Sequence, residues 1–203
     1  MANFNDMQIC SLNVRGLSNN SKRRETFLWL RKKKFSNIYF LQETHSSSDT
    51  EAYWRSEWGY SALFTNFSSS KAGVGILFNN NFQFNILRSL IDPEGRFIIV
   101  DIETKGEILT LLNIYAPNQD DPTFYKNVGE NISSFECDFI VFGGDFNLVC
   151  DVHKDKKGGA PVTQWKSRNE VELLKQKFEL MEFSTQILGV IPGEGKKQKF
   201  NAI

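Results

Sequence analysis

Short apolar runs that end in Gly, Asn, Pro or Ser recur along the chain and predict β-strands bounded by turns. Two of these runs, within Phe97–Glu103 and Phe139–Phe142, begin with four consecutive apolar residues, which predicts strands covered on both faces. The predicted strands are Met7–Asn13, Asn37–Glu43, Tyr60–Phe64, Val74–Phe78, Phe97–Glu103, Ile108–Tyr115 and Phe139–Phe142.

Apolar residues three and four positions apart predict helices between and after these strands. The predicted helices are about Lys22–Lys33, Pro122–Ser134 and Arg168–Phe183. The third helix carries its apolar face on Val171, Leu174, Phe178 and Met181. Many strands with a few covering helices predict an α/β layered domain. We expect one domain over residues 1–190, followed by a polar tail over 191–203.

Composition narrows the class of protein. The 18 Phe and 4 Trp are enough to fill a substantial core, and the formal net charge is zero. A neutral chain does not hold nucleic acid by bulk charge alone. No apolar stretch reaches the roughly 20 residues of a membrane span, and the first residues do not resemble a secretory signal. We therefore expect no membrane partner and a nuclear or cytoplasmic location, not secretion.

Three cysteines, Cys10, Cys137 and Cys150, lie far apart and are odd in number. This argues against a disulfide framework or a zinc site and favours structural thiols in a reducing compartment. Two basic runs, Lys22–Arg24 and Arg31–Lys34, flank the first predicted helix. They fit either a solvated helix face or contacts to phosphate, and charge alone does not decide between them.

Four strand ends carry polar residues where a buried strand would simply turn. They bring Asn13, Glu43, Tyr115 and Asp145 to the ends of predicted strands. Ligand sites of layered α/β proteins often lie at the carboxyl ends of strands. Carboxylate and amide oxygens suit a hard cation such as Mg²⁺ or Mn²⁺, and such a site serves phosphate chemistry. Taken singly each signal is weak, because Asn13 alone is more often a turn residue and Asp145 after two glycines is compatible with a loop cap.

Taken in order, these segments resemble the endonuclease/exonuclease/phosphatase superfamily, which includes apurinic/apyrimidinic endonucleases and the exonuclease III type. Within it, the chain is most similar to the endonucleases of LINE-type (non-LTR) retrotransposons. The resemblance covers about residues 7–160 and implies a four-layer α/β sandwich with two facing mixed sheets flanked by helices. The motifs that carry it are SLNVRGL, FLQETH, GVGI, EGRF, NIYAPN, GGDFN and DKKGG.

The resemblance also implies roles for single residues. Glu43 would bind the divalent metal, Mg²⁺ or Mn²⁺, with Asn13 beside it. Asp145 would orient and activate the attacking water, and Asn147 would help to place the water and the phosphate. Tyr115 would hydrogen-bond the scissile phosphate.

Three further residues are candidates for substrate binding. Asn118 would shape the loop behind the site. Arg96 belongs to the family's Gly-Arg pair and either contacts the phosphate backbone or braces the site. His45 follows Glu43 by two residues, so it either approaches the phosphate or metal or has a structural role in the loop. His153 is expected to be exposed.

The implied reaction is in-line attack of water on a phosphodiester of duplex DNA, leaving a 3′-hydroxyl. We expect a monomer, joined in its parent protein to a downstream reverse transcriptase domain. An abasic-site repair nuclease is an alternative within the same class. A relative acting on inositol phosphates or phospholipids is a more distant one.

The sequence departs from the family pattern in one respect. The family closes with a Ser-Asp-His-like motif on a late strand, and no Ser-Asp-His occurs in these 203 residues. Neither His45 nor His153 stands where it could take over that role by motif. We therefore expect that the last strands of the fold are missing. A catalytically inactive remnant of such a nuclease is then a competing interpretation.

Overall fold

The computed structural model describes residues 7–33, 36–135, 139–148 and 164–181, and the two short strands at 188–189 and 198–199. The chain divides into two compact units. The first comprises residues 1–115, 137–145 and 182–203, and the second comprises residues 116–136 and 146–181.

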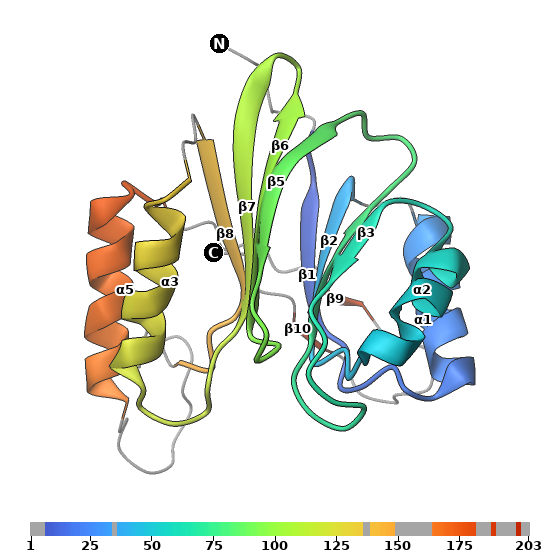
Figure 1. Ribbon diagram of the computed structural model, residues 1–203, viewed down its shortest axis with the longest axis horizontal. Helices are drawn as coiled ribbons and strands as arrows, with labels where there is room; N and C mark the ends of the chain where they lie inside the picture. Colours follow the sequence, from blue (N-terminus) through green and yellow to red (C-terminus); the bar gives the residue numbers. More distant parts are fainter. Residues whose placement is uncertain are drawn as a thin grey trace. The chain divides into compact units, whose positions relative to one another are not determined.

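The first unit contains two mixed four-stranded sheets (Figure 1). The first sheet has the order β1 (Ile9–Asn13), β2 (Ile38–Gln42), β4 (Val74–Phe78), β3 (Ala62–Phe64). The second has the order β5 (Asn85–Ile91), β6 (Phe97–Thr104), β7 (Glu107–Tyr115), β8 (Phe139–Asp145). In each sheet one pair is parallel, β1 with β2 and β7 with β8, and the other neighbours are antiparallel. The short strands β9 (Leu188–Gly189) and β10 (Gln198–Lys199) pair with each other.

The two sheets face each other across an apolar core. Alternate residues of every strand point to the same side. Phe40 and Ile76 of the first sheet thereby meet Val100 and Leu111 of the second, and all four are fully buried. The strand positions are therefore fixed by packing along most of their length, up to the ends where polar residues replace apolar ones.

Two helices, α1 (Asn20–Lys33) and α2 (Ser48–Trp58), cover the outer face of the first sheet (Figure 1). Phe27 of α1 and Trp58 of α2 meet edge to face, and both pack in one cluster with Leu41 of β2. The Trp58 indole N–H also donates to the carbonyl of Phe78, 3.1 Å away. This layer holds β2, and hence the segment that follows it, in place.

The second unit contains two helices side by side, α3 (Pro122–Ile132) and α5 (Trp165–Lys177) (Figure 1). Asp121 caps α3 by accepting from the backbone N–H of Phe124 at 3.2 Å. The Lys177 ammonium donates to the Ser133 hydroxyl at 2.7 Å. None of the helices in the described ranges is long and apolar enough to cross a bilayer.

The predicted fold class, an α/β sandwich of two mixed sheets with helices, is confirmed, and every predicted strand is present. Four elements were missed, and two of them are the short strands β9 and β10. The other two are α2 and β5. Helix α2 buries only Trp54 and Trp58, four positions apart, so its apolar pattern is sparse. Strand β5 has no buried residue and contains a bulge between Ile86 and Arg88, which breaks the alternation that marks a strand.

Two predicted features are wrong in detail. The third helix ends at Lys177, not Phe183, so that Val171 and Leu174 are buried whereas Met181 is 74% exposed. Strand β8 is not covered on both faces, since Phe139 is 39% exposed. Among the described strands β8 is the last in its sheet, and this edge position explains the exposure of an apolar run. The other apolar run, Phe97 to Val100, is fully buried as predicted.

The solvated-face interpretation of the basic runs is wrong for Arg23. Its guanidinium is buried, pairs with Glu57 of α2, and lies 4.9 Å from the Trp54 ring. Arg23 thus joins α1 to α2 and is not available to a phosphate. Cys10 is a buried free thiol, as predicted, and burial raises its pKa to about 11. Cys137 and Cys150 lie outside the described residues.

Candidate active site

The candidate site forms where the carboxyl ends of the two parallel strand pairs meet. In the first sheet Asn13 ends β1 and is paired with Gln42, which directly precedes Glu43. In the second sheet Tyr115 ends β7 and is paired with Asp145, which ends β8. Parallel strands bring their carboxyl ends to the same edge of a sheet, so four of the predicted residues gather at one edge of the sandwich.

The Asn13 side chain joins the two sheets at this edge. Its amide nitrogen donates to Glu43 Oε1 at 2.8 Å and to Asp145 Oδ2 at 2.9 Å. Its amide oxygen accepts from the backbone N–H of Arg15 at 3.0 Å. The amide therefore uses both of its N–H donors to hold two carboxylates close together, one following β2 and one ending β8. Two carboxylates held this close attract a cation.

Tyr115 faces the same pair of carboxylates. Burial raises the pKa of Tyr115 to about 12. The charge of the Glu43 carboxylate reaches its phenol and also raises its pKa, as does the charge of Asp145, against the opposing charge of Arg96. The Arg96 guanidinium lies 5.1 Å from the centre of the Tyr115 ring. The phenol consequently stays protonated at neutral pH and can donate a hydrogen bond.

The backbone around Glu43 adopts a conformation that residues other than glycine rarely take. Glu43 has φ 52° and His45 has φ 57°. The segment is held by main-chain bonds to neighbouring loops, from Gly16 N–H to the Glu43 carbonyl at 2.7 Å and from His45 N–H to the Ala72 carbonyl at 3.0 Å. Such conformations cluster at functional sites, where the surrounding structure enforces them.

His45 packs against the loop after β1. A Cβ atom added at Gly16, whose φ is +81°, would lie only 2.6 Å from His45 Nδ1. Burial lowers the pKa of His45, so its imidazole is neutral at pH 7. These contacts account for a structural role of His45 in the loop, and its contact with substrate stays a prediction.

Gly144 sets the direction in which Asp145 leaves β8. Its φ is +132°, and a Cβ atom there would lie 2.1 Å from the Ile114 carbonyl oxygen of the adjacent strand. Only glycine fits, because the neighbouring atom is backbone and cannot move aside.

We expect Gly144→Ala to destabilise the protein by about 3 kcal/mol, or roughly 6–12 °C in Tm for a chain of this size. Thermal unfolding followed by circular dichroism measures the change. Gly106→Ala is the matched control, since Gly106 also has positive φ (+80°) but nothing within 4 Å of the added Cβ. Equal losses in the two variants would contradict the steric explanation.

Asn118 and Asn147 belong to the second unit, three residues after Tyr115 and two residues after Asp145 along the chain. The Asn147 amide donates to the Ala116 carbonyl at 2.6 Å, and Asn147 has φ 48°. The Asn118 carbonyl accepts from the Gln164 side chain at 2.6 Å. Asn147 thus ties together the two segments that follow the strand ends. The predicted roles of both asparagines stay predictions, and His153 and the DKKGG segment lie outside the described residues.

The donor atoms of the site fit a hard divalent cation. Glu43 and Asp145 offer carboxylate oxygens, the ligands that Mg²⁺ prefers, and Mg²⁺ is usually held by one or two carboxylates with water completing its shell. In the part of the chain that the structure describes, no three His, Cys, Asp or Glu side chains gather as a metal-binding group. An ion here would therefore rely on carboxylate oxygen and water and not on a protein cage of the zinc type.

Directly beneath the site lies a set of buried polar residues to which sequence reasoning gave no role. They are Ser11, Gln42 and Asn113, all on the facing sides of the two sheets. Ser11 and Asn113 each stand two positions before a site residue, in strands that are otherwise apolar. That spacing could have identified them, since positions i and i+2 of a strand share a face.

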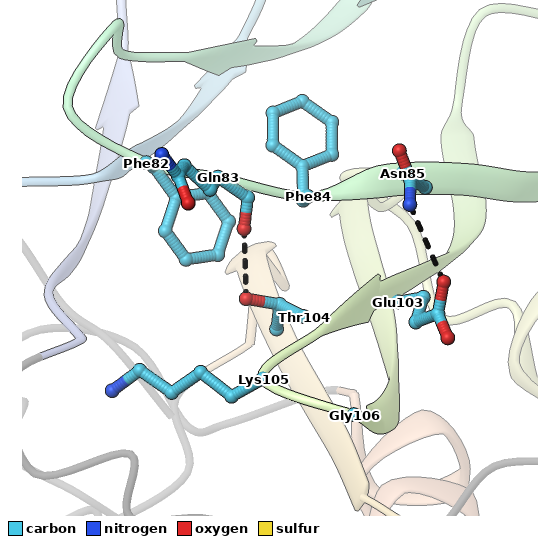
Figure 2. Close-up of a pocket in the computed structure, with 8 residues that line it drawn as sticks. All are labelled: Phe82, Gln83, Phe84, Asn85, Glu103, Thr104, Lys105 and Gly106. Atoms are coloured by element: carbon cyan, nitrogen blue, oxygen red, sulfur yellow. Dashed lines mark hydrogen bonds between the residues drawn. The ribbon is translucent and has the colours of Figure 1, made fainter.

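A separate hollow of about 480 Å³ lies at the opposite end of β6 and β7, around their connecting turn (Figure 2). In Figure 2 the Thr104 hydroxyl donates to the Gln83 carbonyl and the Asn85 amide donates to Glu103. The hollow is widely open and contains none of the predicted site residues. It is lined by Phe82, Gln83, Phe84, Asn85, Glu103, Thr104, Lys105 and Gly106.

The fold and the site define an α/β sandwich protein with an acidic centre at the carboxyl ends of its parallel strands. Residues 10–153 match the Endonuclease/Exonuclease/phosphatase family. The chain belongs to this family, whose members include nucleases and other phosphoester hydrolases.

Individual relatives agree with this assignment. Over 148 residues the chain is 29% identical to the Transposon TX1 uncharacterized 149 kDa protein of Xenopus laevis. The match covers 71% of the chain but only 11% of the length of that protein.

Solved structures with the same fold include the AP endonuclease LMAP from Leishmania major, with TM-score 0.62 and 14% identity over 93% of this chain and 76% of that one. They also include the endonuclease domain of TRAS1, a telomere-specific non-LTR retrotransposon, with TM-score 0.56 and 13% identity over 97% of this chain and 85% of that one. At these identities the likeness concerns the fold.

Proposed function

We propose that the chain is a divalent-metal-dependent DNA endonuclease of the LINE retrotransposon and apurinic/apyrimidinic type. The observation that carries the proposal is the Asn13 amide, which holds Glu43 and Asp145 together across the two sheets. Family membership and the similarity to a transposon protein support a nucleic-acid substrate. We expect a monomer acting on duplex DNA in the nucleus or cytoplasm, with a reverse transcriptase domain downstream in its parent protein.

Glu43 would hold Mg²⁺ or Mn²⁺, with Asn13 beside it. When bound, such an ion supplies positive charge against the negative charge of the phosphate. The Asn13 amide nitrogen is already committed to the two carboxylates, so we assign it the task of fixing their separation. Asn13 thereby keeps Glu43 and Asp145 at one reacting centre.

Asp145 would accept a proton from the attacking water and orient it toward phosphorus. The protonated phenol of Tyr115 would donate to a non-bridging phosphate oxygen, where negative charge grows as water adds. Asn147 would help to place the water and the phosphate, and Asn118 would shape the loop behind them. Arg96, over the Tyr115 ring, would brace the phenol or meet the phosphate backbone.

The bond changes balance as a hydrolysis. The water oxygen forms a bond to phosphorus while the bond from phosphorus to O3′ breaks in line with it. One water proton passes to Asp145, and the departing O3′ takes up a proton from a solvent water to become a 3′-hydroxyl. The products are a 3′-hydroxyl end and a 5′-phosphate end at a nick.

A panel of substrates tests the proposal. The full chain in Mg²⁺ is offered supercoiled plasmid, a duplex oligonucleotide with one abasic analogue, and an inositol polyphosphate. We expect nicking of plasmid and oligonucleotide at comparable rates and no phosphate release from the inositol compound. Cleavage confined to the abasic duplex would instead indicate a repair nuclease, and phosphate release a phosphatase. Binding of duplex DNA without any cleavage would identify an inactive nuclease.

A further inference from the structure

The buried residues beneath the site cross from one sheet to the other. Gln42 of β2 donates to Asn113 Oδ1 of β7 at 2.7 Å and lies 3.1 Å from the Ser11 hydroxyl. Asn113 Nδ2 donates to the carbonyl of Leu41 at 3.0 Å and to that of Gly75 at 2.9 Å. Asn113 thus makes three hydrogen bonds, and all three reach residues of the first sheet.

This arrangement is not needed to fill the core. Immediately below it the sheets pack through apolar residues such as Phe40 and Leu111, and Asn113 and Gln42 are as buried as these, at 0% and 1% exposed. A buried hydrogen bond contributes little net stability compared with apolar packing of the same shape. Hydrogen bonds do, however, specify a distance, because they weaken steeply outside a narrow range of lengths and angles.

The spacing that these bonds specify is the one on which the site depends. Glu43 directly follows Gln42, the last residue of β2, and Tyr115 lies two residues after Asn113 on β7. The hydrogen bond from Asn13 to Asp145 crosses between the sheets. The contact between Asn13 and Glu43 does not, since both residues belong to the first sheet.

We propose that Asn113 and Gln42 are positioning residues that fix the separation of the two sheets directly beneath the site, so that Asp145 and Tyr115 reach the same phosphate as Glu43. Neither side chain touches substrate. The inference rests on the proposed function for its kinetic consequences, but its geometric consequence can be measured without any activity.

The test compares three variants of the full chain. Asn113→Leu removes the three cross-sheet bonds and keeps the number and branching of the side-chain heavy atoms, and Gln42→Met removes one of the bonds from the other side. Thr110→Val is the matched control on the same strand, because Thr110 is also fully buried and hydrogen-bonds Asp101. Thr110 lies three positions from Asn113 and therefore points to the opposite face of the sheet.

Crystal structures of the variants give the first readout. In Asn113→Leu or Gln42→Met, we expect the distance from Asn13 Nδ2 to Asp145 Oδ2 to lengthen beyond about 3.5 Å, the limit of a hydrogen bond. The distance from Asn13 Nδ2 to Glu43 Oε1, within one sheet, should stay at 2.8 Å. An unchanged cross-sheet distance in both variants would overturn the proposal, whether or not the wild-type chain cleaves DNA.

Single-turnover nicking gives the second readout. Displacement of reacting groups by about 1 Å can cost roughly 100-fold in rate, so we expect the single-turnover rate constant to fall about 10- to 100-fold in Asn113→Leu. The Kd for duplex DNA should stay unchanged, and Thr110→Val should keep the wild-type rate constant. If the wild type nicks DNA and Asn113→Leu loses no more activity than Thr110→Val, the positioning role is wrong while the proposed function stands. A wild type that does not nick refutes the proposed function instead.

Discussion

Replacing Asp145 by asparagine should lower the single-turnover rate of DNA nicking by about 10²–10⁴-fold, the range typical for loss of a general base. The asparagine oxygen can still accept the hydrogen bond that the Asn13 amide donates at 2.9 Å. What the variant loses is the ability to take a proton from water. The rate should therefore fall while the Tm and the Kd for DNA change little.

Asp101→Asn is the matched control for this prediction. Asp101 is also a buried carboxylate of the second sheet, where it accepts from Thr110 at 2.6 Å and pairs with Arg88 at 2.7 Å. It lies on β6, away from the strand ends that form the site. We expect Asp101→Asn to lower the Tm and to leave the nicking rate of the folded protein unchanged. Near wild-type nicking by Asp145→Asn would show that Asp145 is not the base.

The second large effect is expected for Glu43→Gln. Loss of a carboxylate that holds the divalent cation should weaken Mn²⁺ binding, measured by electron paramagnetic resonance, by more than the roughly 10- to 100-fold typical of residues that only support a ligand. Nicking should fall with it and recover in part at high Mn²⁺ concentration. Glu103→Gln, a change at an exposed carboxylate near the opposite end of the same sandwich, should leave both measurements unchanged.

Glu43→Gln should also change the titration of Tyr115. In the wild-type protein the Tyr115 pKa is about 12, against about 10 in the unfolded chain. The folded state thus favours the neutral phenol, so this contribution to stability is complete below pH 10 and is lost as the pH rises through 12. Removing the Glu43 charge should lower the Tyr115 pKa, so that the contribution to stability is lost at a lower pH. Spectrophotometric titration in EDTA measures the Tyr115 pKa. An unaltered titration would show that the Glu43 charge does not reach Tyr115.

The part of the site that could be predicted from sequence is the part that breaks a simple pattern. Asn13, Glu43, Tyr115 and Asp145 each end or follow a strong apolar strand, and strand ends of parallel pairs converge. Knowledge of the strands alone therefore brings these residues to one edge of the sandwich. The observed register, with Asn13 opposite Gln42 and Tyr115 opposite Asp145, places all four at that edge.

The remainder depends on contacts between segments that are distant in sequence. From the sequence, Arg23 belongs to a charged helix face. In the structure it pairs with Glu57 and packs on the Trp54 ring of α2. From the sequence, Asn113 is a polar residue within an apolar strand. In the structure its amide hydrogen-bonds the Gln42 side chain and the Leu41 carbonyl. Strand β5 is hidden in the sequence by its bulge. For Arg23 and Asn113 the residues that determine the role are distant in sequence, and a local sequence pattern does not contain them.

Nicking of supercoiled plasmid by the full 203-residue chain shows whether this site hydrolyses DNA with the help of a divalent cation. The reaction is run in Mg²⁺, in EDTA, and with Asp145→Asn in Mg²⁺. We expect open circles with 3′-hydroxyl ends in the first reaction and intact plasmid in the other two. A chain that is folded by circular dichroism yet leaves the plasmid intact at every Mg²⁺ concentration would contradict metal-dependent hydrolysis at this site, and so would nicking that persists in EDTA.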